Sequence, residues 1–526
     1  MAAQRPTPED FAQVLEVLRA IEADRGVLAA LTSAQRTELL QLAGQITKPD
    51  RRALRKMAKA LRRADRERAQ AADRRIIDQT GLRVQRRAPV YAPLWLPPPT
   101  PEEAASTAAA AVDPRLQRAR SCYVCKADYT VPHRYYDAMC VPCGDFNYAK
   151  REQTADLRGH CALVTGARVK IGYQAALKLL RAGARVVVTT RFPVDAAARY
   201  ARENDYAEFR ERLQVFGLDL RHTPSVEIFA RALAERLPRL DYIVNNACQT
   251  VRRPAGWFRH LLPAEAQPYE ALPVEWRDTL SLHAELCRSL AGEGATGASV
   301  APAGATARDS AGDALVAAGA LPPASGLVHS AALSQRRYLD EDFRDGAALF
   351  PAGLYDADLQ QVDLRDTNSW RLRLHEVNTA ELLEVQLINA IAPYTLNARL
   401  RPLMVATPGA HKHIVNVSAM EGQFYRTTKT DRHPHTNMAK AALNMMTRTS
   451  APDYLRDGIH MNAVDTGWVT DEDPAVHAAR KAELGFAPPL DVLDGAARIV
   501  DPIFEGQRTG RHAWGQFLKD YRPAPW

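Results

Sequence analysis

The sequence predicts an α/β protein built on a mostly parallel sheet, and three observations carry that prediction. From residue 160 onward, short apolar runs such as CALVT, ARVVVTT and LDYIVNN alternate with helical stretches such as IGYQAALKLLRAG. The runs are apolar almost throughout, which is typical of strands covered by helices on both faces. Glycines follow the first strand and the first helix. Alternation of this length indicates βαβ units and a doubly wound sheet.

Length and composition bound the class of protein. The chain has 526 residues, enough for two to four domains, and a hydrophobic share of 46%, which is ordinary for a globular protein. No apolar run reaches the length of about 18 residues that suggests a membrane span, and the first residues lack the apolar core of a signal peptide. Of seven cysteines, four are clustered, unlike a secreted disulfide framework. We therefore expect a cytoplasmic protein without a membrane segment.

The net charge of +8 is concentrated in one segment. Residues 51–75 hold 11 Lys/Arg against 3 Asp/Glu, a surplus of 8. Residues 1–87 have apolar positions at helical spacing, including Phe11, Leu15 and Leu18, and predict a small helical bundle with one solvated basic face. A protein or nucleic-acid partner at 51–75 is the alternative, although the segment lacks aromatic residues for base stacking.

The remaining chain divides by composition. Residues 88–120, with a proline triplet and an alanine run, predict a linker. Residues 121–150 form a cysteine-containing module, and residues 155–526 form the α/β domain. That domain carries a long insertion at about 251–375, of which 293–325 is rich in Ala, Gly and Ser and is expected to be disordered. The run QQVDLRDTNSW within the insertion is expected to be ordered, as a lid over a substrate cleft or as a subunit contact.

The cysteine-containing module predicts a zinc site. Two CxxC pairs, Cys122/Cys125 and Cys140/Cys143, are separated by 14 residues. Four thiolates satisfy tetrahedral Zn²⁺ and leave no open position, so the metal would be structural. His133 lies between the pairs as a possible substitute ligand, but four cysteines suffice.

The first turn of the α/β domain, TGARVKIG, is a candidate dinucleotide phosphate site. Gly166 permits a tight turn, Gly172 permits close helix packing, and the following helix offers amide donors to a pyrophosphate. Such turns are common, but here Asp219 follows the third strand and Asn245-Asn246-Ala247 ends the fourth.

With these motifs the sequence resembles the short-chain dehydrogenase/reductase family. The resemblance covers about 158–250 and 376–520 and rests on TGARVKIG, LDL, NNAC, QLINAIAPYTL, IVNVSAMEG, NMAK and NAVDTGWVT in that order. It implies a Rossmann-type parallel sheet of about seven strands, an NAD(P) site and a homo-oligomer. It further implies that Lys440 holds the nicotinamide ribose, Asn389 serves a proton relay and Asp219 meets the adenine. The expected cofactor-binding residues are Gly166, Arg168, Lys170, Ile171, Gly172, Arg191, Asp219, Leu220, Asn245, Ala247, Lys440 and Gly467.

Charge at the end of the second strand bears on the choice of coenzyme. An acidic residue there would bind the 2′-hydroxyl of NAD, but the strand ends Thr189-Thr190-Arg191. Arg191, with Arg168 nearby, suits a 2′-phosphate through charge-assisted hydrogen bonds. We therefore expect NADP rather than NAD, unless Arg191 merely faces solvent.

Four positions depart from the family pattern. Lys170 replaces the middle glycine of the first turn, Ser418-Ala419 places alanine where the catalytic serine belongs, and Thr466-Gly467 replaces Pro-Gly. Most seriously, Thr436 stands four residues before Lys440, where the family has its catalytic tyrosine. A threonine alcohol is a poor general acid or base, so Thr436 is expected to orient substrate or relay a proton at most.

Replacement acids are sought in the segment 421–435, which is longer than usual for the family. Tyr425 could bring a phenol to the nicotinamide, and His435 or His433 titrates closest to neutral pH. Asp465 is a further titratable group near the expected site. For each, the ordinary alternative is a packed tyrosine or a surface histidine without function.

Two functions are compatible with the sequence. The first is an atypical NADP-dependent oxidoreductase that transfers hydride to or from an unknown carbonyl or alcohol substrate, with catalytic candidates Lys440, Asn389, Thr436, Ser418, Tyr425 and His435. The second is a non-catalytic NADP-binding scaffold or sensor that meets partners through its zinc and basic regions; loss of the serine and tyrosine favours it.

Overall fold

The computed structural model describes residues 6–93, 115–294, 321–344, 346–425 and 429–526. Most of the predicted linker at 88–120 and of the predicted disordered stretch at 293–325 lies outside these ranges. Two units can be distinguished, Met1–Asp73 and Arg74–Trp526. No described helix is long and apolar enough to cross a lipid bilayer.

The first unit consists of helices, as the sequence predicts. Capping boxes at Thr7 and Thr32 start the first two of them, because a threonine side chain and the residue three positions later satisfy free amide groups reciprocally. However, no side chain of these helices is buried, and Phe11 and Met57 are more than half exposed. The predicted bundle core is therefore not formed within a single chain. The helices are α1 (Pro8–Ala23), α2 (Ser33–Thr47) and α3 (Arg51–Ile77), whose last four residues belong to the second unit.

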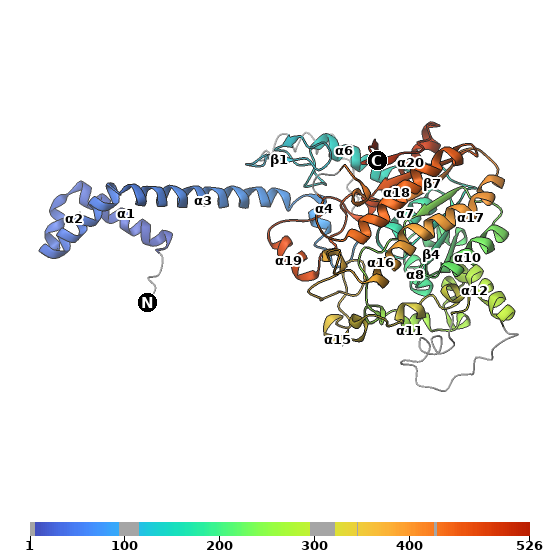
Figure 1. Ribbon diagram of the computed structural model, residues 1–526. Coiled ribbons are helices and arrows are strands. Elements are labelled where there is room, and N and C mark those ends of the chain that lie inside the picture. The colour runs from blue at the N-terminus through green and yellow to red at the C-terminus, as the bar shows by residue number, and fades with distance from the viewer. Residues whose placement is uncertain (1–5, 94–114, 295–320, 345, 426–428) are drawn as a thin grey trace. The chain divides into compact units, whose positions relative to one another are not determined.

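The second unit is built on an eight-stranded sheet with the order β10-β9-β8-β7-β6-β3-β4-β5 (Figure 1). Every neighbouring pair is parallel except β9 and β10, which are antiparallel. This confirms the predicted doubly wound sheet of about seven parallel strands and adds one antiparallel edge strand. The strands are β3 (Cys161–Thr165), β4 (Arg185–Thr190), β5 (Leu213–Gly217), β6 (Tyr242–Asn245), β7 (Lys412–Ser418), β8 (Ile459–Asp465), β9 (Phe517–Lys519) and β10 (Arg522–Ala524).

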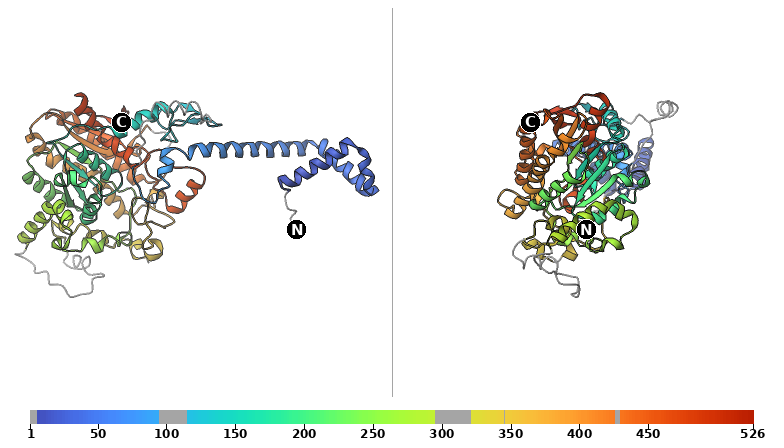
Figure 2. Two further views of the ribbon diagram at one scale, coloured as in Figure 1. Left: turned by 180° about the vertical axis from the view of Figure 1, so that it is seen from behind. Right: turned by 90° about the vertical axis from the view of Figure 1, so that its right-hand side faces the viewer.

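Helices cover both faces of the sheet (Figure 2). Alternate residues of a strand point to opposite faces, so Ala162 and Val164 pack in one apolar core while Leu163 packs in the other. The central strands are therefore buried on both faces and mostly apolar, as the sequence predicts. The helices of this unit with at least eight residues are α6 (Val141–Glu152), α7 (Lys170–Arg181), α8 (Pro193–Tyr200), α10 (Thr223–Arg236), α12 (Val274–Gly294), α16 (Thr379–Gln386), α17 (Ala392–Ala406), α18 (Pro434–Leu455), α19 (Ala475–Glu483) and α20 (Val492–Thr509).

A buried polar network fastens the cysteine-containing module to α20. Arg151, at the end of α6, donates to both carboxylate oxygens of Asp491 at 2.6 and 2.8 Å and lies 3.2 Å from Asp494. The hydroxyls of Tyr135 and Tyr136 donate to Asp491 and Asp494 at 3.0 and 2.5 Å. Burial alone would raise the pKa of Asp491, but the Arg151 charge outweighs burial and holds that pKa below its usual range.

The predicted zinc module contains the short hairpin β1 (Arg120–Ser121) and β2 (Asp128–Tyr129), followed by α6. The short helix α4 (Gly81–Gln85) packs on it, because Arg83 pairs with the buried Asp137 at 2.6 Å. The module also reaches the turn after β8, where the Tyr123 hydroxyl accepts a hydrogen bond from the Trp468 amide at 2.9 Å.

Candidate functional site

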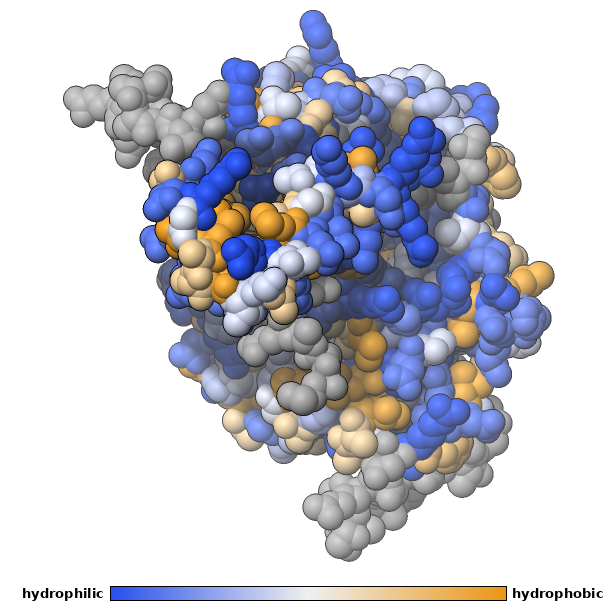
Figure 3. All heavy atoms as spheres, turned by 90° about the vertical axis from the view of Figure 1, so that its left-hand side faces the viewer, coloured by the Kyte–Doolittle hydropathy of each residue, from blue (hydrophilic) through white to orange (hydrophobic). Residues whose placement is uncertain are grey.

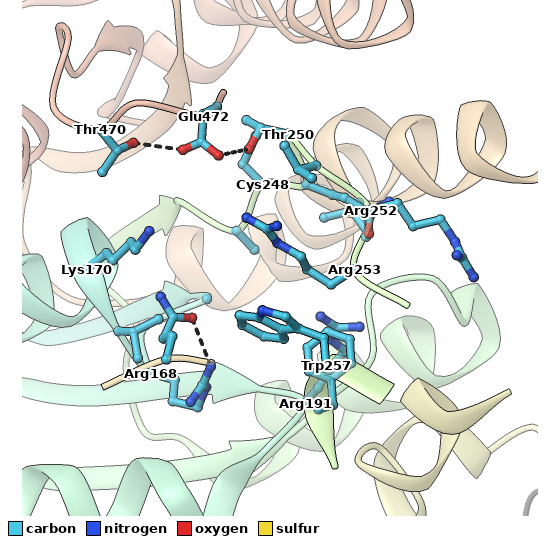
Figure 4. A pocket seen from close by; sticks show the side chains of 18 of the residues that line it. Arg168, Lys170, Arg191, Cys248, Thr250, Arg252, Arg253, Trp257, Thr470 and Glu472 are labelled. Atoms are coloured by element: carbon cyan, nitrogen blue, oxygen red, sulfur yellow. Dashed lines mark hydrogen bonds between the residues drawn. The ribbon is translucent and has the colours of Figure 1, made fainter. Parts of the chain in front are cut away.

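A cleft of about 560 Å³ lies where β3, β4, β5 and β6 end (Figure 4). Ligands of open α/β sheets bind at the carboxyl ends of the strands, where the strand order reverses. The order reverses here between β3 and β6. The cleft is lined by the first turn, the ends of β4, β5 and β6, part of the insertion, the α16 region and the loop after β8 with the start of α19.

The first turn has the geometry that glycine makes possible. Gly166 has a φ of +66°, and a Cβ there would lie 2.7 Å from the Ala247 Cα. At Gly172 a Cβ would lie 2.2 Å from the Asn246 Nδ2 and 2.5 Å from the Gly166 carbonyl oxygen. Both positions are thus closed to larger residues, and α7 approaches β6 closely. The turn leaves the first amides of α7 at the cleft, where they can bind an anion.

Lys170, at the position of the family's middle glycine, has a backbone conformation that favours glycine. Its φ is +56°, in the left-handed region that costs a non-glycine residue about 1–2 kcal/mol. The side chain makes no hydrogen bond or ion pair with any described residue, and Figure 4 shows it reaching into the cleft opposite Arg253. The turn is therefore kept, and a cation is added beside the start of α7.

Arg191 is the second unpaired cation of the cleft. Its guanidinium lies 4.6 Å from the centroid of the Phe258 ring, and it has no carboxylate partner in the part of the chain that the structure describes. Burial, with a smaller contribution from Arg221, lowers its pKa to about 10, so it remains charged at neutral pH. Arg168 also lines the cleft, but it pairs at 2.7 Å with Asp195, a carboxylate that it shares with Arg199.

Asp219 and Leu220 line the cleft just after β5. Asp219 pairs with Arg221 at 2.6 Å, and Arg221 in turn pairs with Glu384 of α16 at 2.8 Å. Burial would raise the pKa of Asp219, but the Arg221 charge outweighs it and lowers the pKa. The ion pairs among Asp219, Arg221 and Glu384 fix the floor of the cleft, and none of these three charges is left unpaired.

The insertion forms one wall. Residues 360–363 and Asn368 line the cleft, and Arg253, which follows β6, pairs with Asp363. Arg252 pairs with the buried Asp342 at 2.8 Å. The run QQVDLRDTNSW is attached to the segment after β6 by the Arg253–Asp363 pair and by the Arg365 guanidinium, which donates to the Arg252 carbonyl at 3.0 Å.

Several cleft residues carry little sequence signal. Trp257 and Phe258 form an aromatic wall, and Glu472 accepts hydrogen bonds from the Thr250 and Thr470 hydroxyls at 3.2 and 2.7 Å. None of these residues is among the site residues predicted from the sequence. Two features shortly after the fourth strand could have indicated the cleft wall: the Arg252-Arg253 pair and the Trp257-Phe258 dipeptide. Polar and aromatic residues at this place in the chain face the carboxyl ends of the strands.

The positions matched to the family's catalytic residues are bonded to other parts of the protein and do not line the cleft. The Lys440 ammonium donates to the Val417 carbonyl at 2.7 Å, and the Ser418 hydroxyl donates to Asn444 at 2.6 Å. Asn389 bridges the backbone of Gln249 at 2.8 and 3.1 Å. Among the described residues that line the cleft there is no member of the predicted catalytic set, Lys440, Asn389, Thr436, Ser418, Tyr425 and His435.

Other predicted cofactor residues are divided between the cleft and the core. Ile171 and Ala247 line the cleft. Asn245 is buried, and its amide donates to Asn397 and Asn416 at 2.8 Å each, so it joins β6 to its neighbours. Gly467 has a φ of +76° and faces the Tyr123 hydroxyl.

A buried cluster of unpartnered polar atoms surrounds Thr436. Neither ring nitrogen of His435 has a hydrogen-bond partner among the described residues, and the same holds for the Thr436 hydroxyl and one Glu381 oxygen. The His435 Nε2 lies 3.8 Å from that Glu381 oxygen. Tyr425, by contrast, is 47% exposed. The roles of these side chains stay predictions.

The buried His435 predicts a pH dependence of stability. Burial, with a smaller electrostatic contribution from His433, lowers the pKa of His435 to about 4, compared with about 6.5 in the unfolded chain. Between about pH 4 and 6.5 only the unfolded chain binds this proton, so the free energy of unfolding falls as the pH falls. Urea unfolding between pH 4 and 6.5 measures this dependence. In the His435→Gln variant, the number of protons taken up on unfolding should be smaller by about one. The exposed His375→Gln serves as control, and an unchanged slope for His435→Gln would contradict the assignment.

The four cysteines of the module converge. Their sulfur atoms all lie within 4.8 Å of one another, and the Cys125 and Cys140 sulfurs are 3.8 Å apart. Two thiolates at about 2.3 Å from a tetrahedral Zn²⁺ are roughly 3.8 Å apart. The module therefore provides a four-thiol cluster of the size that this metal needs.

Comparison with known proteins agrees with the fold. Residues 160–263 match the family model "short chain dehydrogenase", and residues 367–484 match "Enoyl-(Acyl carrier protein) reductase". The chain belongs to the short-chain dehydrogenase/reductase (SDR) family. The gap between the two matches, residues 264–366, lies within the long insertion of this SDR chain.

Individual relatives cover different shares of this SDR chain. It is 30% identical over 412 residues to the uncharacterized protein R665 of Acanthamoeba polyphaga mimivirus, spanning 76% of this chain and 74% of the viral protein. It is 37% identical over 116 residues to dehydrogenase/reductase SDR family member 13 of Homo sapiens, spanning 22% of this chain but only 28% of the human protein. The NADP active-site complex of RhlG from Pseudomonas aeruginosa aligns with a TM-score of 0.40 and 17% identity, over 69% of this chain and 95% of that one.

Proposed function

We propose that this chain is an NADP-dependent oxidoreductase that transfers hydride to or from a carbonyl or alcohol substrate. The observation that carries the proposal is the pair of unpaired cations, Lys170 and Arg191, in a cleft with a glycine turn at the start of α7. Phosphate groups favour helix N-termini and cationic side chains. The two glycines let the turn and α7 pack closely against the segment after β6, which places the start of α7 at the cleft.

The residues present fit a nicotinamide dinucleotide phosphate. The α7 amides and Lys170 would hold the pyrophosphate, Arg191 the 2′-phosphate, and Trp257 with Phe258 would flank the adenine. When bound, the coenzyme supplies or accepts the hydride. The chain's own contribution is to orient the coenzyme and to exclude water with the insertion wall, whose ion pairs hold residues 360–363 in place.

The decisive experiment is a fluorescence titration of the full-length protein with NADPH and NADH. We expect preferential binding of NADPH. Arg191→Ala should weaken NADPH binding roughly 10- to 150-fold, the equivalent of losing a charge-assisted bond of about 1.5–3 kcal/mol, and should change NADH binding little. Failure of wild-type protein to bind either coenzyme would refute the proposal.

Arg185→Ala provides the matched control for this titration. Arg185 is exposed at the opposite end of the same strand, β4, and does not line the cleft. The variant removes the same charge from the same strand and should bind NADPH like the wild type. Equal losses in both variants would mean that Arg191 acts only through net charge.

A non-catalytic NADP-binding module is the second candidate. The observation that favours it is the buried Thr436, whose hydroxyl faces no described partner and lies outside the cleft lining. A protein that binds NADPH selectively but oxidises it with no aldehyde or ketone in a broad panel would support this candidate. Turnover that Tyr425→Phe or His435→Gln abolishes would support the enzyme.

We further propose that Cys122, Cys125, Cys140 and Cys143 hold a structural Zn²⁺. The support is the sulfur spacing and the closed four-thiol arrangement, which leaves no position for substrate. All seven cysteines are free thiols in the structure, which fits the reducing conditions of a cytoplasmic location.

A further inference from the structure

Four histidines gather at the amino-terminal edge of the sheet, at the opposite ends of the strands from the cleft. His411 precedes β7, His413 is its second residue, His460 is the second residue of β8, and His512 follows α20. The His411 Nδ1 lies 3.3 Å from the His460 Nε2, and the His413 Nε2 lies 3.0 Å from the His512 Nδ1. The cofactor and catalytic predictions use none of these residues.

The spacing of the ring nitrogens suits a metal ion. His411, His460 and His512 each offer one nitrogen, and these nitrogens all lie within 4.8 Å of one another. Two imidazole nitrogens at about 2.0–2.1 Å from a tetrahedral Zn²⁺ are roughly 3.3 Å apart. The His411–His460 separation already has this value.

The surroundings make room for the cluster. At Gly506 in α20, a Cβ would lie 2.4 Å from the His512 Nδ1 and 3.2 Å from the His413 Nε2. Glycine inside a helix costs about 1 kcal/mol relative to alanine, and here it allows His512 to dock. The Nδ1 atoms of His413 and His460 are buried without a hydrogen-bond partner among the described residues, so the cluster has unused donor or acceptor capacity.

The hydrogen bond between His413 and His512 orients the latter. Because the His512 Nδ1 is engaged with His413, its Nε2 is left as the ligand atom, which is the arrangement that metal-binding histidines commonly have. The rings of His411 and His512 stack, with centroids 4.0 Å apart and planes 2° apart. A metal lies in the plane of each ligand ring, so the exposed His411 must turn out of the stack on binding.

We propose that His411, His460 and His512 form a binding site for a borderline divalent transition-metal cation, such as Zn²⁺ or Ni²⁺, with His413 as the positioning residue. Neutral imidazole ligands suit these ions rather than Mg²⁺ or Ca²⁺, which prefer oxygen. Three protein ligands leave the remaining position to water. The bound ion would join the starts of β7 and β8 to the segment after α20.

The test is calorimetric titration with Ni²⁺ of tag-free, full-length protein that carries one zinc ion per chain, the amount that the thiol cluster alone would hold. We expect one equivalent to bind. His411→Gln and His512→Gln should each weaken binding at least tenfold, and the exposed His375→Gln should leave it unchanged. Since His411 lies at the surface, its substitution should not impair folding, which circular dichroism would verify. The proposal would be overturned if the wild-type protein bound no equivalent of Ni²⁺, or if the His411→Gln and His512→Gln variants bound Ni²⁺ as tightly as the wild type.

Two further variants distinguish the histidine site from the thiol cluster and test the role of His413. His413→Gln should keep one equivalent at saturation but weaken affinity about 10- to 100-fold, the usual effect of losing an outer hydrogen-bond partner. Cys125→Ser should keep Ni²⁺ binding, because the thiol cluster is a separate site. If Cys125→Ser abolishes Ni²⁺ binding, the titrated ion belongs to the cysteines and the histidine site is refuted.

Discussion

Cys125→Ser is expected to release one zinc ion per chain and to unfold the cysteine-containing module locally. Structural zinc contributes apparent binding free energies of about 10–16 kcal/mol in small zinc domains, and the thiol cluster joins the β1–β2 hairpin to α6. Amide hydrogen exchange should accelerate in residues 115–140 and remain slow in β3 and β7. Metal analysis of the purified protein measures the loss of zinc.

Cys248→Ser is the control for this substitution. Cys248 is also an exposed cysteine, but it lies in the cleft and outside the thiol cluster. The variant should retain zinc and normal exchange in the module. A Cys125→Ser protein with undiminished zinc content would show that these four thiols do not hold the metal.

Arg151→Met is expected to lower the free energy of unfolding by about 3–5 kcal/mol, the usual cost of removing one partner from a buried ion pair. Arg151 is fully buried, and both Asp491 and Asp494 would keep buried carboxyl groups without their cation. Burial and the charge of Asp491 already raise the pKa of Asp494 to about 6. Urea denaturation followed by tryptophan fluorescence measures the change.

Arg399→Met is the matched control, since Arg399 pairs with Glu227 at a similar distance, 2.7 Å, but at the surface. Exposed pairs contribute about 0.2–1 kcal/mol, so this variant should unfold nearly like the wild type. Comparable losses for the two arginines would contradict the claim that burial makes the Arg151 network important.

The sheet could be predicted from sequence because its signals are local. An apolar strand such as β4, a glycine turn and an amphipathic helix each occupy fewer than 20 neighbouring residues. The first turn was predicted for the same reason, since Gly166 and Gly172 lie in one short stretch. Lys170 shows the limit of such patterns, because it has a left-handed backbone conformation that a lysine in the sequence does not indicate.

The walls of the cleft could not be predicted in the same way. Arg253 meets Asp363 across a separation of 110 positions in the sequence, and no local pattern indicates such a pairing. The pairing of Arg168 with Asp195 is similar: charge alone suggested a free cation, whereas the fold supplies a carboxylate. The histidine cluster arises from three segments, of which only the His-x-His at 411–413 is visible in the sequence.

The N-terminal helices show the difference between an apolar stripe and a core. Periodicity identified the apolar side of α1 and α3, and these helices form, but Phe11, Leu54 and Leu61 remain exposed. A space-filling view likewise shows apolar side chains at the surface among hydrophilic ones (Figure 3). An apolar stripe indicates which side of a helix is suited to burial, but it does not indicate which other part of a protein covers that side.

The strand β10 protects the sheet against unwanted growth. Strand edges with free amides and carbonyls template the addition of another chain. β10 is three residues long, and its central Pro523 has no amide hydrogen to donate. At the other end of the sheet α12 packs against β5, where Gln214 bonds to the Asp278 carbonyl. Self-association by strand pairing is thereby disfavoured at both ends of the sheet.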